Sequence, residues 1–151
     1  MRLQRDLREF VELLNSESVE FLIVGGHAVA FHGYPRYTGD LDFFVRPTLE
    51  NAEKLIAALE TFGFGSMGVT AEVLTEPDKV IQLGRVPNRI DLLTSISGVD
   101  FDDAWSTRVA GELDGIPVQY IGRDALLRNK SASGRAKDLG DIEELERQGG
   151  G

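Results

Sequence analysis

Residues 39–45 read Gly39-Asp40-Leu41-Asp42-Phe43-Phe44-Val45, an apolar run that carries two carboxylates. This run predicts a β-strand over residues 40–45, in which side chains two positions apart point to the same face. Asp40 and Asp42 then stand side by side, while Leu41, Phe43 and Val45 point the other way. Adjacent like charges against an apolar wall repel each other. We therefore expect a cation here, and Mg²⁺ is the obvious candidate because carboxylate and phosphate oxygens are its preferred ligands.

A glycine pair precedes this strand, in the sequence Val24-Gly25-Gly26-His27. The apolar residues 21–24 predict a short strand, and residues 27–32 predict a short helix. A glycine pair by itself usually marks a tight turn. At the start of a helix, however, it lets bare backbone N–H groups approach a phosphate closely. The pair is therefore a candidate phosphate contact.

A third carboxylate lies in the sequence Arg89-Ile90-Asp91-Leu92-Leu93-Thr94, within a strand predicted over residues 89–96. The strand is too apolar to hold a charge without a partner. Asp91 either pairs with a cation such as Arg89 or joins Asp40 and Asp42. If the two strands are neighbours, the three carboxylates converge. They are then suited to hold two Mg²⁺ ions roughly 3.5–4 Å apart, the arrangement that clamps a transferring phosphoryl group.

Composition narrows the function classes. The chain has 151 residues, no cysteine and a net charge of −9. The absence of cysteine excludes disulfides and thiolate chemistry, and the negative charge argues against broad binding of nucleic acid. No apolar run approaches the roughly 20 residues that span a membrane. We expect no membrane partner, a cytoplasmic location and a single domain over residues 1–148, with a frayed tail over residues 149–151.

Periodicity predicts the remaining elements. The turn signal Asp114-Gly115 predicts a two-residue β-hairpin. The order of elements predicts an α/β (α+β) fold, with a mixed sheet flanked by helices and with helices at the C-terminal end. The other expected helices cover residues 3–15, 49–62, 71–75, 102–107, 123–132 and 137–148, and the other expected strands cover residues 79–83, 109–113 and 116–121.

These motifs together resemble the DNA polymerase beta-type nucleotidyltransferase superfamily. The shared pattern is Gly-Gly, then Asp-x-Asp on a strand, then a lone acidic residue on a later strand. The chain looks most like the compact single-domain bacterial members. Its tail, which contains Arg128-Asn129-Lys130 and then Gly134-Arg135-Ala136-Lys137-Asp138-Leu139-Gly140-Asp141, resembles the abortive-infection nucleotidyltransferase toxins. The resemblance implies a nucleotidyltransferase-like fold.

The resemblance also implies roles for matching residues. Asp40 and Asp42 would bind two Mg²⁺ ions, and Asp91 would complete one metal site and help to activate the attacking hydroxyl. The reaction would transfer a nucleoside monophosphate from an NTP to an acceptor hydroxyl and release pyrophosphate. Positioning and charge neutralisation carry most of such a transfer.

The nucleotide would be held by four further positions. Gly25 and Gly26 would let the backbone approach the triphosphate. Lys137 is a candidate phosphate contact, although an ordinary surface pair with Asp141 fits its spacing equally well. His27 stands where many members of the superfamily have a phosphate-binding serine.

Several alternatives remain open at this stage. The acceptor is RNA, such as a tRNA end, or a small molecule, and the relatives suggest an antitoxin-like protein partner. The serine position taken by His27 favours a second hypothesis, a non-catalytic nucleotide-binding module of a toxin–antitoxin or regulatory system. The acidic composition is also compatible with a plain interaction domain.

Overall fold

A six-stranded mixed sheet forms the centre of the computed structural model, which describes residues 5–34, 40–63, 68–84 and 89–149. The strand order is β3-β4-β2-β1-β6-β5. The neighbours β2 and β4 run parallel, as do β1 and β6, and the other pairs are antiparallel. The strands are β1 (Phe21–Val24), β2 (Leu41–Val45), β3 (Val80–Leu83), β4 (Ile90–Leu93), β5 (Val109–Leu113) and β6 (Ile116–Tyr120).

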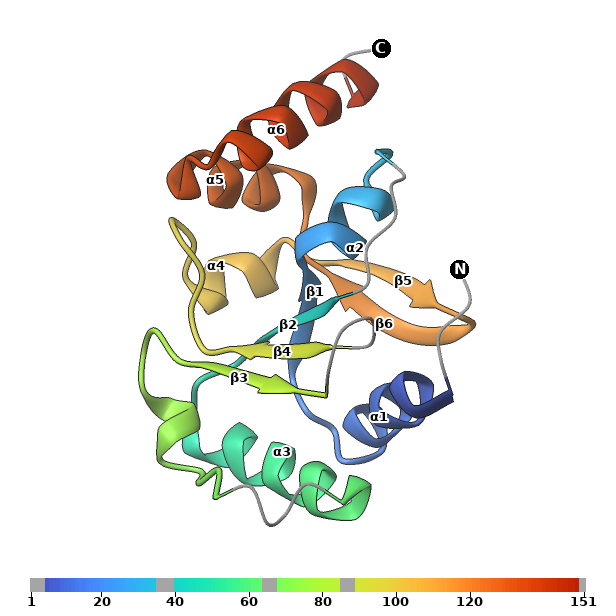
Figure 1. Ribbon diagram of the computed structural model, residues 1–151, viewed down its shortest axis with the longest axis vertical. Helices are drawn as coiled ribbons and strands as arrows, with labels where there is room; N and C mark the ends of the chain where they lie inside the picture. The colour runs from blue at the N-terminus through green and yellow to red at the C-terminus, as the bar shows by residue number, and fades with distance from the viewer. Residues whose placement is uncertain (1–4, 35–39, 64–67, 85–88, 150–151) are drawn as a thin grey trace.

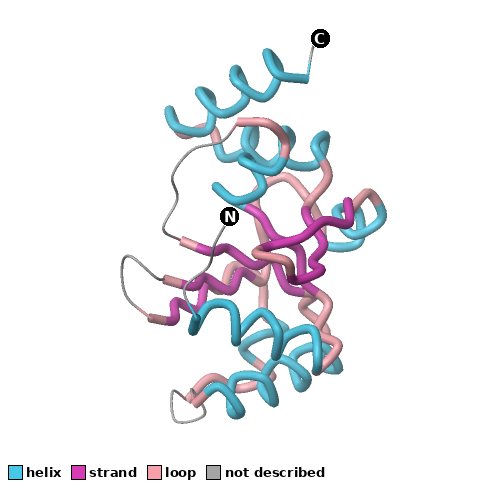
Figure 2. The backbone as a smooth tube through the Cα atoms, turned by 90° about the vertical axis from the view of Figure 1, so that its right-hand side faces the viewer, coloured by secondary structure: helices cyan, strands magenta, loops and turns pink. Residues whose placement is uncertain are grey.

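Helices cover both faces of the sheet (Figures 1 and 2). In the view of Figure 1, α1 and α3 lie below the sheet, whereas α2, α5 and α6 lie above it. The predicted mixed α/β architecture is therefore confirmed. The helices are α1 (Arg5–Ser16), α2 (Gly25–Phe31), α3 (Leu49–Phe62), the 3₁₀ helix η2 (Val73–Thr75), α4 (Phe101–Ser106), α5 (Arg123–Ser133) and α6 (Ala136–Gly149).

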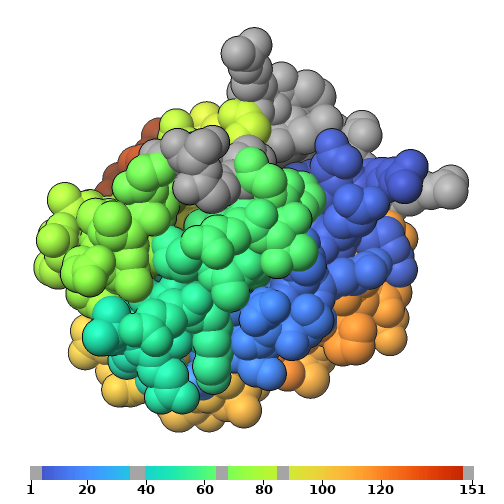
Figure 3. All heavy atoms as spheres, turned by 90° about the horizontal axis from the view of Figure 1, so that it is seen from below, coloured from blue at the N-terminus to red at the C-terminus, as the bar shows by residue number. Residues whose placement is uncertain are grey.

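The lower face of the sheet is an aromatic core. Phe43 of β2 contacts Phe10 of α1, with ring centroids 5.8 Å apart, and Phe21 of β1, at 5.3 Å. Phe10 also meets Phe62 of α3 at 5.3 Å. Figure 3 shows this side of the molecule, where the blue α1 lies beside the green α3. Because side chains alternate along β2, the packing of Phe43 downward turns Asp42 to the opposite, upper face.

Most predicted elements are present within a residue or two of their expected ends. The hairpin turn is confirmed, with Asp114 at φ 52° and Gly115 at φ 80°. Two differences matter. The strand expected over residues 89–96 ends at Leu93, because the chain then turns through Gly98, whose φ is 76°. The glycine pair does not precede α2 but forms its first turn.

Two further expectations concern the boundaries of the domain and the absence of a membrane-spanning segment. Gly39 and residues 150–151 lie outside the described residues, and α6 continues through Gly149. The division into a domain over residues 1–148 and a frayed tail stays a prediction. In the described part of the chain, none of the helices combines the length and the apolar character that crossing a membrane requires.

A buried ionic cluster joins α5 to α6. Lys130 of α5 is 4% exposed, and its Nζ lies 3.1 Å from Oδ1 of Asp138 and 3.2 Å from Oδ2 of Asp141. Asp138 also accepts hydrogen bonds from Arg135, at 2.7 and 3.1 Å. Burial alone would raise the pKa of Asp138, but hydrogen bonds from Arg135, Ser133 and Lys130 hold it well below its usual range. The cluster therefore fixes the angle between the two helices.

We expect Lys130→Met to lower the free energy of unfolding by about 3–5 kcal/mol, because it leaves the buried carboxylates of Asp138 and Asp141 without their shared cation. Lys137→Met is the matched control, since Lys137 is exposed on the same helix pair. It should change the free energy by no more than about 0.5 kcal/mol. Urea unfolding measures both. Equal effects of the two substitutions would refute a structural role for the cluster.

Candidate active site

Two of the three predicted carboxylates lie opposite each other on neighbouring strands. In the parallel pair β2–β4, Asp42 is in register with Asp91. The strand adjacency that the metal hypothesis requires is thus present. Asp40 directly precedes β2, and its backbone neighbour Leu41 donates a hydrogen bond to the carbonyl of Arg89 at the start of the same strand pair. The sheet therefore brings Asp40, Asp42 and Asp91 to one end of two adjacent strands.

The proximity of these acids changes the protonation of Asp42. The pKa of Asp42 is raised to about 6, and burial is the largest cause. The negative charges of Asp91 and Asp40 and a hydrogen bond with Asp91 also contribute to this rise. The positive charge of Arg89 only partly opposes it. Without a bound cation, Asp42 therefore keeps its proton into the mildly acidic range. A carboxyl group that holds a proton in this way can exchange it for a metal ion.

Arg89 spans the other two acids. Its Nη2 donates hydrogen bonds to Oδ2 of Asp40 at 2.9 Å and to Oδ2 of Asp91 at 3.2 Å. Its Nε lies 3.1 Å from Oδ1 of Asp91. The alternative in which Asp91 pairs with Arg89 is therefore realised. Among the described residues, the guanidinium of Arg89 thus compensates two of the three carboxylates.

The donor set fits Mg²⁺ in its chemistry, because it consists of carboxylate oxygens beside a cleft that has room for phosphates. Its spacing differs from the expected convergence. Among the residues that the structure describes, no three acidic or imidazole side chains are close enough together to hold a metal ion as they stand. Asp40 and Asp91 both turn to Arg89. Asp40, Asp42 and Asp91 are the residues that would hold the ion.

Gly25 packs directly against the Asp42 side chain. It has φ 69°, and a Cβ atom at this position would lie 2.1 Å from Oδ2 of Asp42. Only glycine combines this left-handed backbone with so close an approach. Gly26 follows as a buried residue in the same helical turn. Gly25 thus leaves room for the Asp42 carboxylate, a role that the sequence pattern did not reveal. Its contact with a phosphate stays a prediction.

A cleft of about 440 Å³ opens above Asp42 and Gly25, within the roughly 300–1,000 Å³ typical of small-molecule sites. Its opposite wall comes from the end of α5 and from the turn into α6. The polar residues of this wall are Asn129, Lys130, Ser133 and Arg135. The hydrogen bond to Asp138 raises the pKa of Arg135 most. The negative charge of Asp42 also contributes to this rise, so Arg135 and Asp42 attract each other across the cleft.

Sequence reasoning found the basic cluster near the C-terminal end and selected Lys137 from it as a candidate phosphate contact, which stays a prediction. Lys137 is exposed on α6 and is not among the described residues that line the cleft. Asp141, its expected surface partner, is 2% exposed and binds Lys130. Arg135 and Lys130 line the cleft instead. The pattern of a lysine followed by acids eight and eleven positions later, across a glycine turn, was the signal available for Lys130.

His27 lies behind the glycine pair rather than on the surface. It is 6% exposed, and burial lowers its pKa, while the charge of Asp40 opposes that shift. The imidazole is therefore neutral near pH 7. A buried neutral imidazole is a poorer phosphate ligand than an exposed hydroxyl or a cation.

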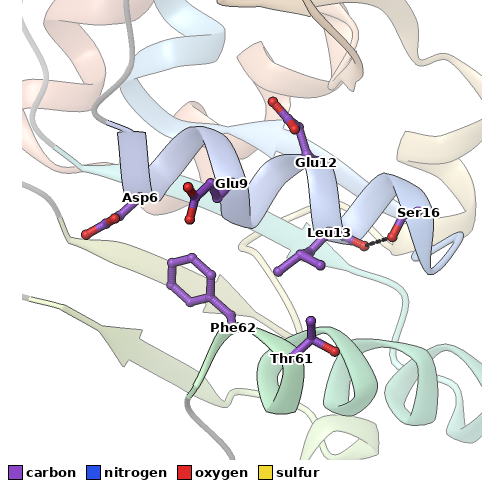
Figure 4. Close-up of a pocket in the computed structure, with 7 residues that line it drawn as sticks. All are labelled: Asp6, Glu9, Glu12, Leu13, Ser16, Thr61 and Phe62. Atoms are coloured by element: carbon purple, nitrogen blue, oxygen red, sulfur yellow. Dashed lines mark hydrogen bonds between the residues drawn. The ribbon is translucent and has the colours of Figure 1, made fainter.

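A second hollow, larger than this cleft, lies on the other side of the sheet. It measures about 800 Å³ and runs between α1 and α3 (Figure 4). Leu13 and Phe62 face each other across it, and acidic residues of α1 such as Glu9 and Glu12 form its rim. These two glutamates already pair with Arg5 and Arg8 of the same helix. The hollow contains none of the three site carboxylates, so the smaller cleft is the candidate active site.

We expect Gly25→Ala to lower the free energy of unfolding by about 1–3 kcal/mol, because the new methyl group meets Asp42 and the residue must keep a left-handed backbone. Gly140→Ala is the matched control. Gly140 is an exposed helical residue with open space around its Cβ position, so alanine should be neutral or slightly stabilising there. Equal stability of the two variants in urea unfolding would contradict this account.

The raised pKa of Asp42 predicts a pH dependence of stability in the metal-free protein. The folded state binds the proton more tightly than the unfolded state, so the contribution of Asp42 is fully present below pH 3.8 and is lost as the pH rises through about 6. As the pH rises from 3.8 to above 6, the free energy of unfolding of wild type should therefore fall by up to about 3 kcal/mol relative to that of Asp42→Asn, which has no proton to lose at this position. Urea unfolding in EDTA across this range measures the difference. A difference that does not change with pH would refute the prediction.

Comparisons with known proteins agree with this geometry. The sequence profile of a family described as "Nucleotidyl transferase of unknown function (DUF2204)" matches residues 3–149. No curated protein matches the chain. Among solved structures, a protein from Thermotoga maritima assigned to the nucleotidyltransferases is 16% identical, with a TM-score of 0.54 over 95% of this chain and 88% of that one.

Two further structures have the same fold. The lincosamide antibiotic adenylyltransferase LnuA, with lincomycin bound, is 16% identical, with a TM-score of 0.58 over 95% of this chain and 96% of that one. A nucleotidyltransferase-like protein from Paracoccidioides brasiliensis is 17% identical, with a TM-score of 0.55 over 94% of this chain and 75% of that one. The resemblance to the nucleotidyltransferase superfamily is confirmed, and the chain belongs to this family of nucleotidyl transferases of unknown function.

Proposed function

We propose that this protein transfers a nucleoside monophosphate from an NTP to an acceptor hydroxyl, with Mg²⁺ as cofactor and pyrophosphate as the other product. The observation that carries the proposal is the register of Asp42 with Asp91, on two strands whose end is lined by Gly25 and Asp40. Three acids that share one guanidinium among the described residues, beside a cleft of nucleotide size, are suited to divalent metal and phosphate.

In this reaction the acceptor attacks the nucleotide directly, so the protein positions the two reactants and forms no covalent intermediate. The acceptor oxygen forms a bond to the α-phosphorus, the bond from that phosphorus to the bridging oxygen breaks, and pyrophosphate leaves. Asp40, Asp42 and Asp91 would hold Mg²⁺, which supplies neutralisation of the charge on the phosphates. Asp91, the most enclosed of the three, would orient the attacking hydroxyl and accept its proton. Arg135 and Asn129 would face the nucleotide from the opposite wall.

The acceptor class is a question for experiment, with a small molecule as the first choice. LnuA acts on a lincosamide antibiotic, as its name states, and the present chain has the same fold. The net charge of −9 disfavours a long RNA, whose phosphates need many basic contacts. An RNA acceptor and an antitoxin-like protein partner, both suggested by the resemblance to toxins, stay predictions.

We expect the protein to release pyrophosphate from at least one NTP in the presence of Mg²⁺ and an acceptor, and Asp42→Asn to reduce the rate at least about a hundredfold. Incubation with each α-labelled NTP, against a panel of hydroxyl-bearing small molecules and against RNA, measures transfer. The matched control is Asp124→Asn, which makes the same charge change at an exposed position of α5. It should leave the rate unchanged. Transfer that persists in Asp42→Asn would overturn the proposal.

The buried neutral His27 favours one competing function, a module that binds nucleotide without turnover. The same experiment separates the two. Tight binding of an NTP with no pyrophosphate release across the whole panel would support the module. Turnover with any acceptor would exclude it.

A further inference from the structure

Arg89 occupies an unusual place in the candidate site, because, among the described residues, its side chain is a cation that contacts two of the three acids. Its Nη2 lies 2.9 Å from Oδ2 of Asp40 and 3.2 Å from Oδ2 of Asp91, and its Nε lies 3.1 Å from Oδ1 of Asp91. Its side chain is 31% exposed, so water screens these contacts only in part. Two of the three acids proposed to hold Mg²⁺ therefore already have a cationic partner.

This position has opposite consequences for two forms of the metal. A free Mg²⁺ ion that approaches Asp40 and Asp91 meets a positive guanidinium, which repels it and competes for the same oxygens. A complex of Mg²⁺ with a nucleoside triphosphate carries a net negative charge. Arg89 attracts that complex, and a guanidinium binds phosphate oxygens as readily as carboxylate oxygens. One charge therefore disfavours the bare ion and favours the metal–nucleotide complex.

We propose that Arg89 is a specificity-determining positioning residue that makes the site select the metal–nucleotide complex over free Mg²⁺. This inference rests on the proposed function. Its physical basis is the balance of charge: the guanidinium of Arg89 contacts two of the three acids, so it lowers the attraction of the site for a bare divalent ion. The site then fills with metal when nucleotide arrives, so that catalytic metal and substrate enter together.

The test is a pair of calorimetric titrations, one with Mg²⁺ alone and one with each of the four NTPs in excess Mg²⁺, on wild type and on Arg89→Gln. We expect Arg89→Gln to bind free Mg²⁺ about tenfold more tightly and the preferred metal–nucleotide complex about tenfold more weakly. Changes of opposite sign in these two affinities are the result that selection by Arg89 predicts. A residue that only stabilised the fold would weaken both equilibria or neither, and either of those results would overturn the inference.

Two further variants make the result interpretable. Arg147→Gln removes the same charge from an exposed ion pair at the end of α6, and it should leave both affinities unchanged. Arg89→Lys keeps the charge, so it should stay within about threefold of wild type in both titrations even if Arg89→Gln fails to fold. A loss of the preference in Arg89→Lys as large as in Arg89→Gln would show that charge is not the cause.

The outcomes also separate this inference from the proposed function. If wild type binds none of the four metal–nucleotide complexes, both fail. If wild type binds one of them and Arg89→Gln changes the two affinities in the same direction, the selection by Arg89 fails and the nucleotide site remains.

Discussion

Repulsion among the carboxylates of Asp40, Asp42 and Asp91 is the constraint around which the upper face of this protein is organised. The parallel pairing of β2 with β4 brings Asp42 and Asp91 into register, and the apolar packing of Phe43 on α1 prevents Asp42 from turning away. Among the described residues, Arg89 reduces the repulsion, and below about pH 6 a proton on Asp42 reduces it further. Core packing therefore stabilises a cluster that would otherwise separate.

A second pair of acidic residues shows how repulsion between buried carboxylates is compensated within the protein itself. Asp138 and Asp141 are fully buried, yet Lys130 and Arg135 match them charge for charge. That cluster is complete within the protein and serves to hold α5 against α6. In the part of the chain that the structure describes, the cluster at β2 and β4 has three acids that share the guanidinium of Arg89. The difference in charge balance separates a structural ion cluster from one that is suited to bind a cation.

The two clusters are connected through the cleft. The α5–α6 cluster fixes Arg135 on the wall that faces Asp42, so the structural ion pairs place a basic side chain where phosphates of a nucleotide would lie. Gly25 completes the arrangement from the start of α2, because its missing side chain leaves room for the Asp42 carboxylate. The site is therefore built from residues in four separate parts of the chain.

The sequence by itself determined the elements, the mixed α/β class and the three acidic residues, because alternation and helical spacing are local properties and Asp-x-Asp on a strand is a local pattern. It also gave the superfamily resemblance that the family profile confirms. The tertiary structure alone decided that Arg89 bridges Asp40 and Asp91, that Lys130 is buried while Lys137 is exposed, and that Gly25 supports Asp42. These facts depend on which surfaces meet when the helices close over the sheet, and charge pairing between distant segments leaves no periodic signal in the chain.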